Sequence, residues 1–493
     1  MRPVKNAFAF YGLPILAAVV AAIPAPAAAQ GDKPPVAQDL AGFNPAYLDR
    51  SADPCQDFDQ FACGTWKKNN PVPSDRSSWT SSDVLYLNNL AVLYDILGKT
   101  AADDAKRSPI ERRIGDYYAA CMDEDSIEAR GTAPLQDDLA RIAQLKDKAA
   151  LPALIARLHT RGVGAAFDFG STPDYKKTER TIAQAEQGGL GLPTRDYYTA
   201  EDARSKEIRT QYVAHLQKLF ELLGDPADKA AAQAQAVMRL ESGLAKGTLT
   251  PVEARDPEKV YNLLKLADFQ ALTPSFRWQD YLQGVGAPAF QELNVATPDF
   301  FRQLEAQIKG ASLDDWKAYL RARVVDAAAP LLPAAFVQQD FAFNAATLSG
   351  VKELSPRWRR CIQRVDDHLG EDLGQKYVEV AFGEKSRERM DQLVKDLLQA
   401  MERDIKALDW MGEETKKQAL TKLARMGDKV GYPRRWRDYS SLQVARGDAL
   451  GNWRRGEGFE LRHQLSKIGK PTDDEEWLIT PATVNAYYNP AAN

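Results

Sequence analysis

The chain has 493 residues, of which 44% are hydrophobic and 27% charged, and its formal net charge is −4. The hydrophobic fraction supports a sizeable core, which excludes a wholly disordered chain. The 64 basic and 68 acidic residues give no positive excess, so we expect no nucleic-acid partner. With only four histidines, the sequence offers little material for a metal site built from imidazoles.

The start of the chain has the pattern of a secretory signal peptide. Two basic residues precede an apolar run at residues 7–23, and small alanines follow at 27–29. A membrane anchor is the alternative, because about 17 apolar residues is the lower limit for a spanning helix. We predict a cleaved signal peptide at 1–29 and a linker at 30–50. The mature protein is then expected to be exported, to the periplasm of a Gram-negative bacterium or outside the cell, with no stable membrane anchor.

The four cysteines are disulfide candidates in an exported protein. Their positions are Cys55, Cys63, Cys121 and Cys361, and no two of them form a Cys-x-x-Cys motif. Four cysteines allow three pairings, and spacing alone does not choose among them.

The rest of the chain reads as helices separated by glycine and proline. In the clearest segment, apolar residues recur along one face of a helix with 3.6 residues per turn. Strand signals are few and lie at residues 164–170 and 477–488. We therefore predict a mainly α fold, one large helical body with a different element at its C-terminus, and helices within residues 202–245, 312–329, 386–411 and 413–426.

The sequence has no visible catalytic centre of its own. Zinc hydrolases commonly place two histidines one helical turn apart with a glutamate between them, in the pattern His-Glu-x-x-His. That pattern is absent, and each histidine is more simply read as a surface or core-edge residue. The four positions are His159, His215, His368 and His463.

Three charged stretches admit two interpretations each. Residues 357–360 and 434–437 mix tryptophan with arginine, which fits nucleic-acid binding or a core tryptophan with arginines paired to carboxylates. The acidic overall charge favours the second interpretation. Residues 473–476 could hold catalytic carboxylates, but we predict a solvated turn or a helix start.

Several blocks, in order along the chain, resemble those of the neprilysin-like zinc metallopeptidases, which include neprilysin and the endothelin-converting enzymes. The blocks span about 430 residues, and single ones could arise by chance. They are DPCQDF at 53–58, FACGTW at 61–66, QGGLGLP at 187–193, RDYY at 195–198, GYP at 431–433 and VNAYYNP at 484–490.

The resemblance implies a neprilysin-type helical domain at residues 51–474. It also implies that 475–493 is the first strand region of a thermolysin-like catalytic domain whose remainder is absent from this sequence. In the family, this strand binds peptide substrates through residues matching Asn485, Ala486 and Tyr487. The family's zinc ligands and acid–base residues have no counterpart here, so no catalytic or metal residue is carried over, and we expect no zinc bound to this chain.

The resemblance also implies a pairing of the cysteines. Cys121 and Cys361 match a pair that the family closes within its helical domain. The family partners of Cys55 and Cys63 lie in the absent segment, so these two are expected to be unpaired.

Two functions follow as hypotheses. The first is the N-terminal portion of an exported zinc metalloendopeptidase that hydrolyses peptides, inactive as given because the His-Glu-x-x-His segment is missing. The alternative is a non-catalytic helical protein that binds peptides or acts as a scaffold.

Overall fold

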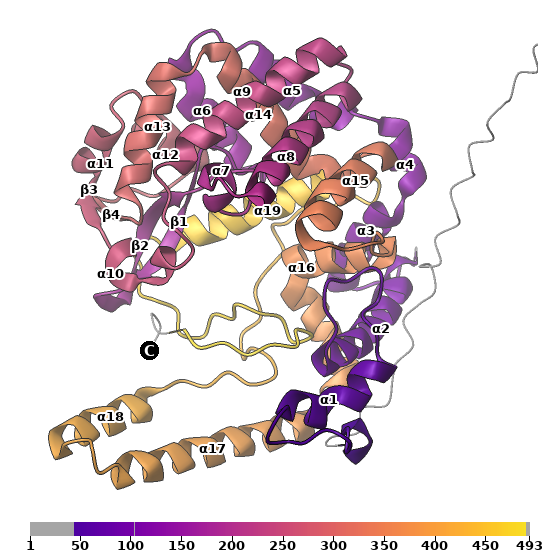
Figure 1. Ribbon diagram of the computed structural model, residues 1–493, viewed down its shortest axis with the longest axis vertical. Helices are drawn as coiled ribbons and strands as arrows, with labels where there is room; N and C mark the ends of the chain where they lie inside the picture. Colours follow the sequence, from indigo (N-terminus) through magenta and orange to yellow (C-terminus); the bar gives the residue numbers. More distant parts are fainter. Residues whose placement is uncertain (1–43, 103, 490–493) are drawn as a thin grey trace, which may run out of the picture.

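The computed structural model describes residues 44–102 and 104–489, and most of its regular structure is helical (Figure 1). The longer helices are α1 (Phe58–Asn69), α2 (Ser81–Ala101), α3 (Pro109–Met122), α8 (Ala203–Leu222), α9 (Ala227–Ala245), α13 (Pro298–Gly310), α14 (Leu313–Ala328), α16 (Arg357–Ala381), α17 (Glu384–Ala407), α18 (Glu413–Arg425) and α19 (Ala449–Ser466). The shorter ones are α4 (Glu124–Arg130), α5 (Gln136–Ala143), α6 (Leu151–His159), α7 (Asp196–Thr199), α10 (Pro257–Val260), α11 (Leu266–Leu272), α12 (Trp278–Val285) and α15 (Ala334–Asp340). The mainly α prediction is confirmed. The predicted signal peptide at 1–29 and most of the linker at 30–50 lie outside the described residues.

The predicted helices form close to their expected bounds. Residues 202–245 divide into α8 and α9 because Gly224, with φ of +95°, ends the first helix and Pro226 opens the second. α14 begins at a capping box in which the side chains of Ser312 and Asp315 satisfy each other's backbone N–H groups. α17 and α18 occupy the segments predicted at 386–411 and 413–426.

A small sheet interrupts the helical body. Its strands β1 (Phe167–Asp174), β2 (Lys177–Gln187), β4 (Glu292–Val295) and β3 (Leu263–Lys265) lie in that order. The β1–β2 and β3–β4 pairs are antiparallel, and β2 and β4 are parallel. The strand predicted at 164–170 is therefore found as β1, shifted by a few residues, whereas β2, β3 and β4 were not predicted.

The core is formed by two groups of packed elements. In the first, α8, α9, α13 and α14 pack together beside the sheet, with fully buried aromatic side chains that include Phe167, Trp278 and Phe301. In the second, α2, α3 and α16 pack against one another. A disulfide joins Cys121 of α3 to Cys361 of α16 with a Cα–Cα distance of 5.7 Å. This is the pair that the resemblance implies.

α17 and α18 extend as an arm along the bottom of the molecule in Figure 1, and neither helix contains a buried residue. The predicted apolar stripe of α17 is present but lies open to solvent in this structure. Met390, Leu393, Leu397 and Met401 are 40 to 61% exposed. Amphipathic helices usually bury such a stripe.

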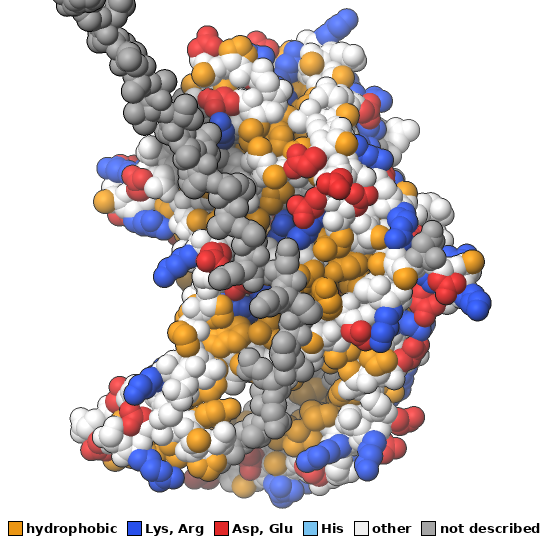
Figure 2. All heavy atoms as spheres, turned by 90° about the vertical axis from the view of Figure 1, so that its right-hand side faces the viewer, with side chains coloured by type: hydrophobic (Ala, Val, Ile, Leu, Met, Phe, Trp, Pro, Cys, Tyr) orange, Lys and Arg blue, Asp and Glu red, His pale blue; other side chains and the backbone are white. Residues whose placement is uncertain are grey.

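Apolar side chains also reach the surface around α1 and α2. Phe58, Val72 and Leu85 are exposed. The face on this side of the molecule carries several hydrophobic patches between clusters of charged side chains (Figure 2).

Candidate functional site

The C-terminal segment, residues 467–489, carries the sequence-predicted substrate-binding residues, and its first part is hydrogen-bonded to β2. The Gly469 N–H donates to the Thr181 carbonyl, and the Thr181 N–H donates to the Lys470 carbonyl, both at 2.9 Å. The Thr472 N–H donates to the Glu179 carbonyl at 3.0 Å. After α19 the segment therefore pairs briefly with the first half of β2, an inner strand of the sheet.

The segment then crosses to the second group of helices. Thr480 and Pro481 pack onto α16 where it presents Gly370 and Gly374, and a Cβ on these glycines would lie 2.5 Å from Thr480 and 2.7 Å from Pro481. The Asn89 side chain of α2 donates to the Ala482 carbonyl at 2.8 Å. The C-terminal segment thus joins the sheet to α2 and α16, as its course between them in Figure 1 shows.

The strand predicted at 477–488 is not confirmed. The structure assigns no strand to these residues, and hence no orphan strand at 475–489. A strand is stabilised by hydrogen bonds to a neighbouring strand, and within the described residues this stretch has no such neighbour. The backbone instead turns back on itself, so that the Leu478 N–H donates to the Tyr487 hydroxyl at 3.4 Å.

A cavity of about 810 Å³ lies against this segment. Its walls come from the β1–β2 hairpin, from α19, from the loop at 429–438 and from the C-terminal segment itself. Aromatic and apolar side chains line one part of it: Trp436, Phe459, Trp477, Leu478 and Tyr487. A concave site of this size with apolar walls and a few placed polar groups is typical of ligand binding.

The three predicted substrate residues are placed differently from one another. Tyr487 lines the cavity. Asn485 and Ala486 are exposed and do not belong to its wall. The Ala486 N–H donates to Oδ1 of Asn485 at 2.8 Å, so the asparagine side chain is engaged by its own backbone.

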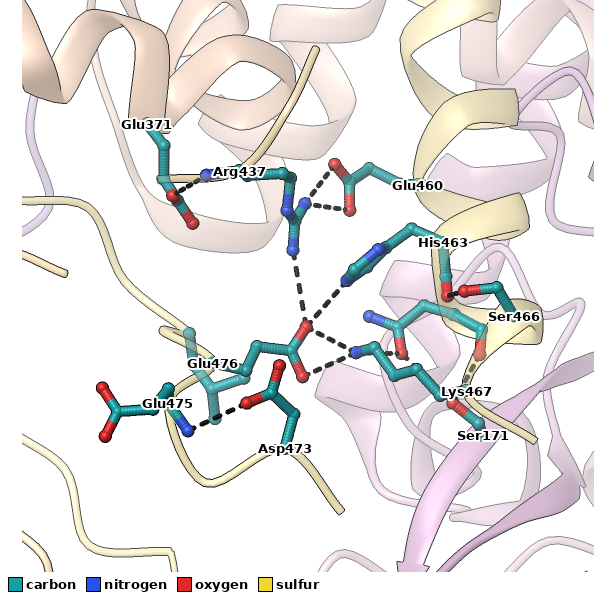
Figure 3. A network of polar contacts seen from close by, with 12 residues as sticks. Ser171, Glu371, Arg437, Glu460, His463, Ser466, Lys467, Asp473, Glu475 and Glu476 are labelled. Atoms are coloured by element: carbon teal, nitrogen blue, oxygen red, sulfur yellow. Dashed lines mark hydrogen bonds and ion pairs between the residues drawn. The ribbon is translucent and has the colours of Figure 1, made fainter. Parts of the chain in front are cut away.

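The polar part of the cavity is centred on Glu476 (Figure 3). Its carboxylate accepts hydrogen bonds from Nε2 of His463 at 2.8 Å and from Nζ of Lys467 at 2.7 Å. Arg437 lies 3.5 Å from the same carboxylate and donates to both oxygens of Glu460 at 2.7 and 2.9 Å. Burial raises the pKa of Glu476, but the bonds from His463 and Lys467 outweigh it and lower the pKa to about 2.

This network was not predicted as a unit. Glu476 was expected in a solvated turn, whereas only 20% of its side chain is exposed. The neighbouring Asp473 and Glu475 do form an exposed turn, in which the Glu475 N–H donates to Asp473. Arg437 pairs with carboxylates, as the second interpretation of residues 434–437 predicted.

The histidines do not form a metal site. Each has polar partners within the protein: Tyr281 and the Ala165 carbonyl for His159, Asp326 and Gln339 for His215, Tyr117 and Glu457 for His368, and Glu476 for His463. Burial lowers the pKa of His159 to about 4. In residues 44–102 and 104–489, no three histidine, cysteine, aspartate or glutamate side chains are grouped so as to hold a metal ion. These residues therefore do not fit the zinc ion that the resemblance implies.

Most of the chain matches the model of a known peptidase family. The family model described as peptidase family M13 matches residues 54–433. The chain belongs to peptidase family M13. Endothelin-converting enzyme 1 of Rattus norvegicus and of Homo sapiens are each 29% identical to it over 467 residues, which cover 90% of this chain and 60% of each relative. The M13 chain thus spans about 60% of the length of these curated relatives.

Solved structures of a bacterial zinc metalloprotease share the fold. The inhibitor complex of Mycobacterium tuberculosis Zmp1 is 33% identical, with a TM-score of 0.86 over 91% of this chain and 69% of that one. The open state of Zmp1 is 34% identical, with a TM-score of 0.78 over 89% of this chain and 68% of that one. The M13 chain therefore superposes better on the inhibitor complex.

The glycine-rich M13 block at 187–193 is a buried structural turn. Tyr319 donates its hydroxyl to the Gly189 carbonyl at 2.6 Å. The Gly191 N–H and the hydroxyls of Tyr198 and Tyr212 all donate to the fully buried carboxylate of Glu241. These contacts hold the turn against α9 and α14. Packing within the protein therefore accounts for the glycines, and no bound ligand is needed to explain them.

The remaining two cysteines lie near the start of the M13 match. Cys55 and Cys63 are exposed and form no disulfide within the described residues.

Proposed function

We propose that this chain forms the peptide-enclosing helical body of an M13 zinc metalloendopeptidase, with zinc ligands supplied by residues outside the 493-residue sequence. The observation that carries the proposal is the 810 Å³ cavity beside the C-terminal segment, in a chain whose family match covers residues 54–433. Relatives named as a zinc metalloprotease and as endothelin-converting enzymes support the peptide substrate class.

In this proposal the C-terminal segment binds the peptide backbone. Asn485 and Ala486 are exposed beside the cavity, so the asparagine side chain and the Ala486 carbonyl are accessible to an extended peptide. Tyr487 forms part of the cavity wall and contacts an adjacent substrate side chain. Glu476 and its partners fix the path of the segment, because they anchor it to the last turns of α19.

Zinc in such enzymes polarises the scissile carbonyl and activates a water molecule. The histidines of this chain are engaged elsewhere, so its own residues contribute binding and enclosure. The chain by itself is accordingly expected to be inactive.

A non-catalytic peptide-binding or scaffolding protein is the alternative. Its support is that all four histidines are committed to partners within the fold. The peptidase body and a peptide-binding protein both bind peptides and differ in whether the bound peptide is ever cleaved, whereas a scaffold requires neither.

We further propose that the protein is exported, to the periplasm or the exterior, on the strength of the signal-peptide pattern at 1–29. Among the described residues, no helix combines the length and apolar character that crossing a bilayer requires.

Peptide binding is tested with residues 30–493 and a fluorescent decapeptide. Fluorescence anisotropy is expected to show saturable binding, and Asn485→Ala is expected to weaken it by up to about tenfold, because the side-chain hydrogen bond to the peptide backbone is lost. Asn344→Ala is the control, since Asn344 is exposed, does not line the cavity and donates to Asp340. The absence of saturable binding would refute the peptidase body and the peptide-binding alternative, and would leave the scaffold.

Cleavage separates the two functions. The part of Zmp1 outside the matched region is added to the chain together with zinc, and hydrolysis of a quenched peptide is followed. Turnover that requires both components supports the peptidase body. If the zinc-loaded part of Zmp1 binds to the chain and the peptide is bound but not cleaved, the result supports the alternative.

A further inference from the structure

A second cavity, of about 480 Å³, lies at the opposite end of α19 from the candidate site. Four arginines line it, from α4, from the loop after α6 and from the first turns of α19: Arg130, Arg161, Arg454 and Arg455. Asp448 is the acidic residue in its lining. Since α19 has 18 residues, its two ends lie about 25 Å apart, and the two cavities share no lining residue.

We call this second cavity the arginine cavity. Its arginines outnumber the carboxylates that form ion pairs with them. Asp138 is fully buried and lies within 3.3 Å of three guanidinium groups, at 3.3 Å from Arg157, 3.0 Å from Arg161 and 2.8 Å from Arg454. Asp448 is shared in the same way by Arg130 and Arg455, at 3.1 Å each. Arg157 lies outside the lining and also pairs with Asp137. The four lining arginines pair with Asp138 and Asp448, and these two carboxylates neutralise only part of their charge.

Some of these guanidinium groups retain unused donors. Arg454 is nine-tenths buried, and within the described residues its Nε has no hydrogen-bond partner. Arg161 donates only Nε to Asp138, and its two terminal nitrogens have no protein partner there. The Arg454 Nε is enclosed by protein, whereas Arg161 lines the cavity and 26% of its side chain is exposed. A negatively charged ligand that accepts from the terminal nitrogens of Arg161 would therefore stabilise the site.

The site is also preorganised. Arg454 donates one terminal nitrogen to the Pro134 carbonyl at 2.7 Å, and Arg455 donates Nε to the Gln443 carbonyl at 2.8 Å. Burial and the neighbouring Arg161 lower the pKa of Arg454 to about 10. A lowered arginine pKa is expected where several positive groups lie close together with too few carboxylates beside them.

We propose that the arginine cavity binds a phosphate-type oxyanion, free or carried on a larger molecule. Fixed guanidinium groups match the oxygens of such an anion in geometry as well as in charge. The ligand stands apart from the proposed peptidase function, because the cavity lies at the other end of α19.

The proposal is tested by isothermal titration of residues 30–493 with inorganic phosphate and, separately, with tripolyphosphate. One equivalent of phosphate is expected to bind, more weakly as sodium chloride is added. Arg130→Gln is expected to weaken binding about tenfold or more, because a charge-assisted contact is lost. Arg130 lies at the exposed rim, so this variant keeps the buried Asp138 cluster intact.

Arg403→Gln on α17 is the charge-matched control and is expected to bind phosphate as the parent does. Arg161→Gln tests the second contact, and a circular-dichroism melt checks that it folds. Equal affinity for both probes identifies free phosphate as the ligand form, and tighter tripolyphosphate binding identifies a phosphate chain. No saturable binding of either probe, or equal weakening by Arg130→Gln and Arg403→Gln, would overturn the proposal.

Discussion

Nε2 of His463 donates a hydrogen bond of 2.8 Å to the carboxylate of Glu476, which ties the last turns of α19 to the segment that leads to Asn485. Lys467 donates to the same carboxylate from one helical turn further on. The position of the proposed substrate-binding residues therefore rests on this partly buried carboxylate and, further along the segment, on the bond from Asn89 to the Ala482 carbonyl.

The first prediction concerns acid stability. The pKa of Glu476 is about 2 in the folded chain, against an ordinary value of 4.5. A carboxyl with a lowered folded pKa stabilises the fold above its unfolded pKa, and this contribution is lost as the pH falls from about 4.5 towards 2. Glu476→Gln is expected to lower the free energy of unfolding at pH 7 by about 2 to 3 kcal/mol.

Urea unfolding at pH 7 and pH 3 measures this effect. The difference between parent and Glu476→Gln is expected to shrink at the lower pH. Glu475→Gln is the matched control, since its side chain is exposed. A Glu476→Gln variant as stable as that control at pH 7 would contradict the role given to Glu476.

The second prediction concerns the disulfide. Cys121 and Cys361 close a loop of 240 residues. The chain-entropy model gives up to about 5 kcal/mol for a loop of this length. Replacing both cysteines by alanine is expected to lower the urea midpoint markedly, whereas Cys55→Ala with Cys63→Ala should leave it unchanged. If the two double variants unfolded at the same urea concentration, the disulfide would have no stabilising role.

The third prediction tests the glycine-rich block. Gly189 has φ of +70°, and a Cβ there would lie 2.3 Å from the Ala166 nitrogen. Gly189→Ala is expected to destabilise the chain by about 2 kcal/mol or more, because backbone strain and a clash with backbone add together. Gly412→Ala is the control, since its added Cβ would meet no atom within 4 Å. Thermal melts compare the two, and equal melting temperatures would contradict the assignment of the block as a buried turn.

The fourth prediction concerns the exposed stripe of α17. Leu397 is 61% exposed and Leu304 of α13 is fully buried. Leu304→Ala is expected to cost about 2 to 5 kcal/mol, while Leu397→Ala should change the free energy of unfolding by less than about 1 kcal/mol. Chemical unfolding of each variant measures both. A cost of Leu397→Ala similar to that of Leu304→Ala would mean that the stripe is covered in solution.

Local patterns predicted four helical segments. α17 follows from its apolar period, and α14 from a similar pattern rich in alanine, which are local signals. Helices such as α2, α16 and α19 were expected only as parts of a mainly helical body. β2 was missed because Ala183 and Ala185, which are helix formers, are fully buried in it by pairing with β1 and β4. Pairing with strands that are distant in the sequence thus outweighs the intrinsic helix propensity of these alanines.

The candidate site was predictable only in part. The family-like motif located Asn485, Ala486 and Tyr487, but the expected strand depends on a neighbour that the described residues do not supply. Glu476 was missed because its partners, His463 and Arg437, lie 13 and 39 residues away. No local pattern joins them, and only the fold brings α19 and the loop at 429–438 together.

Zinc content tests the central claim most directly. Residues 30–493 are purified, incubated with zinc, dialysed and measured by inductively coupled plasma mass spectrometry. The chain is expected to retain far less than one zinc per molecule, because its histidines are bound to Tyr281, Asp326, Glu457 and Glu476. One tightly held zinc ion per chain, lost on substitution of any of these histidines, would contradict the account.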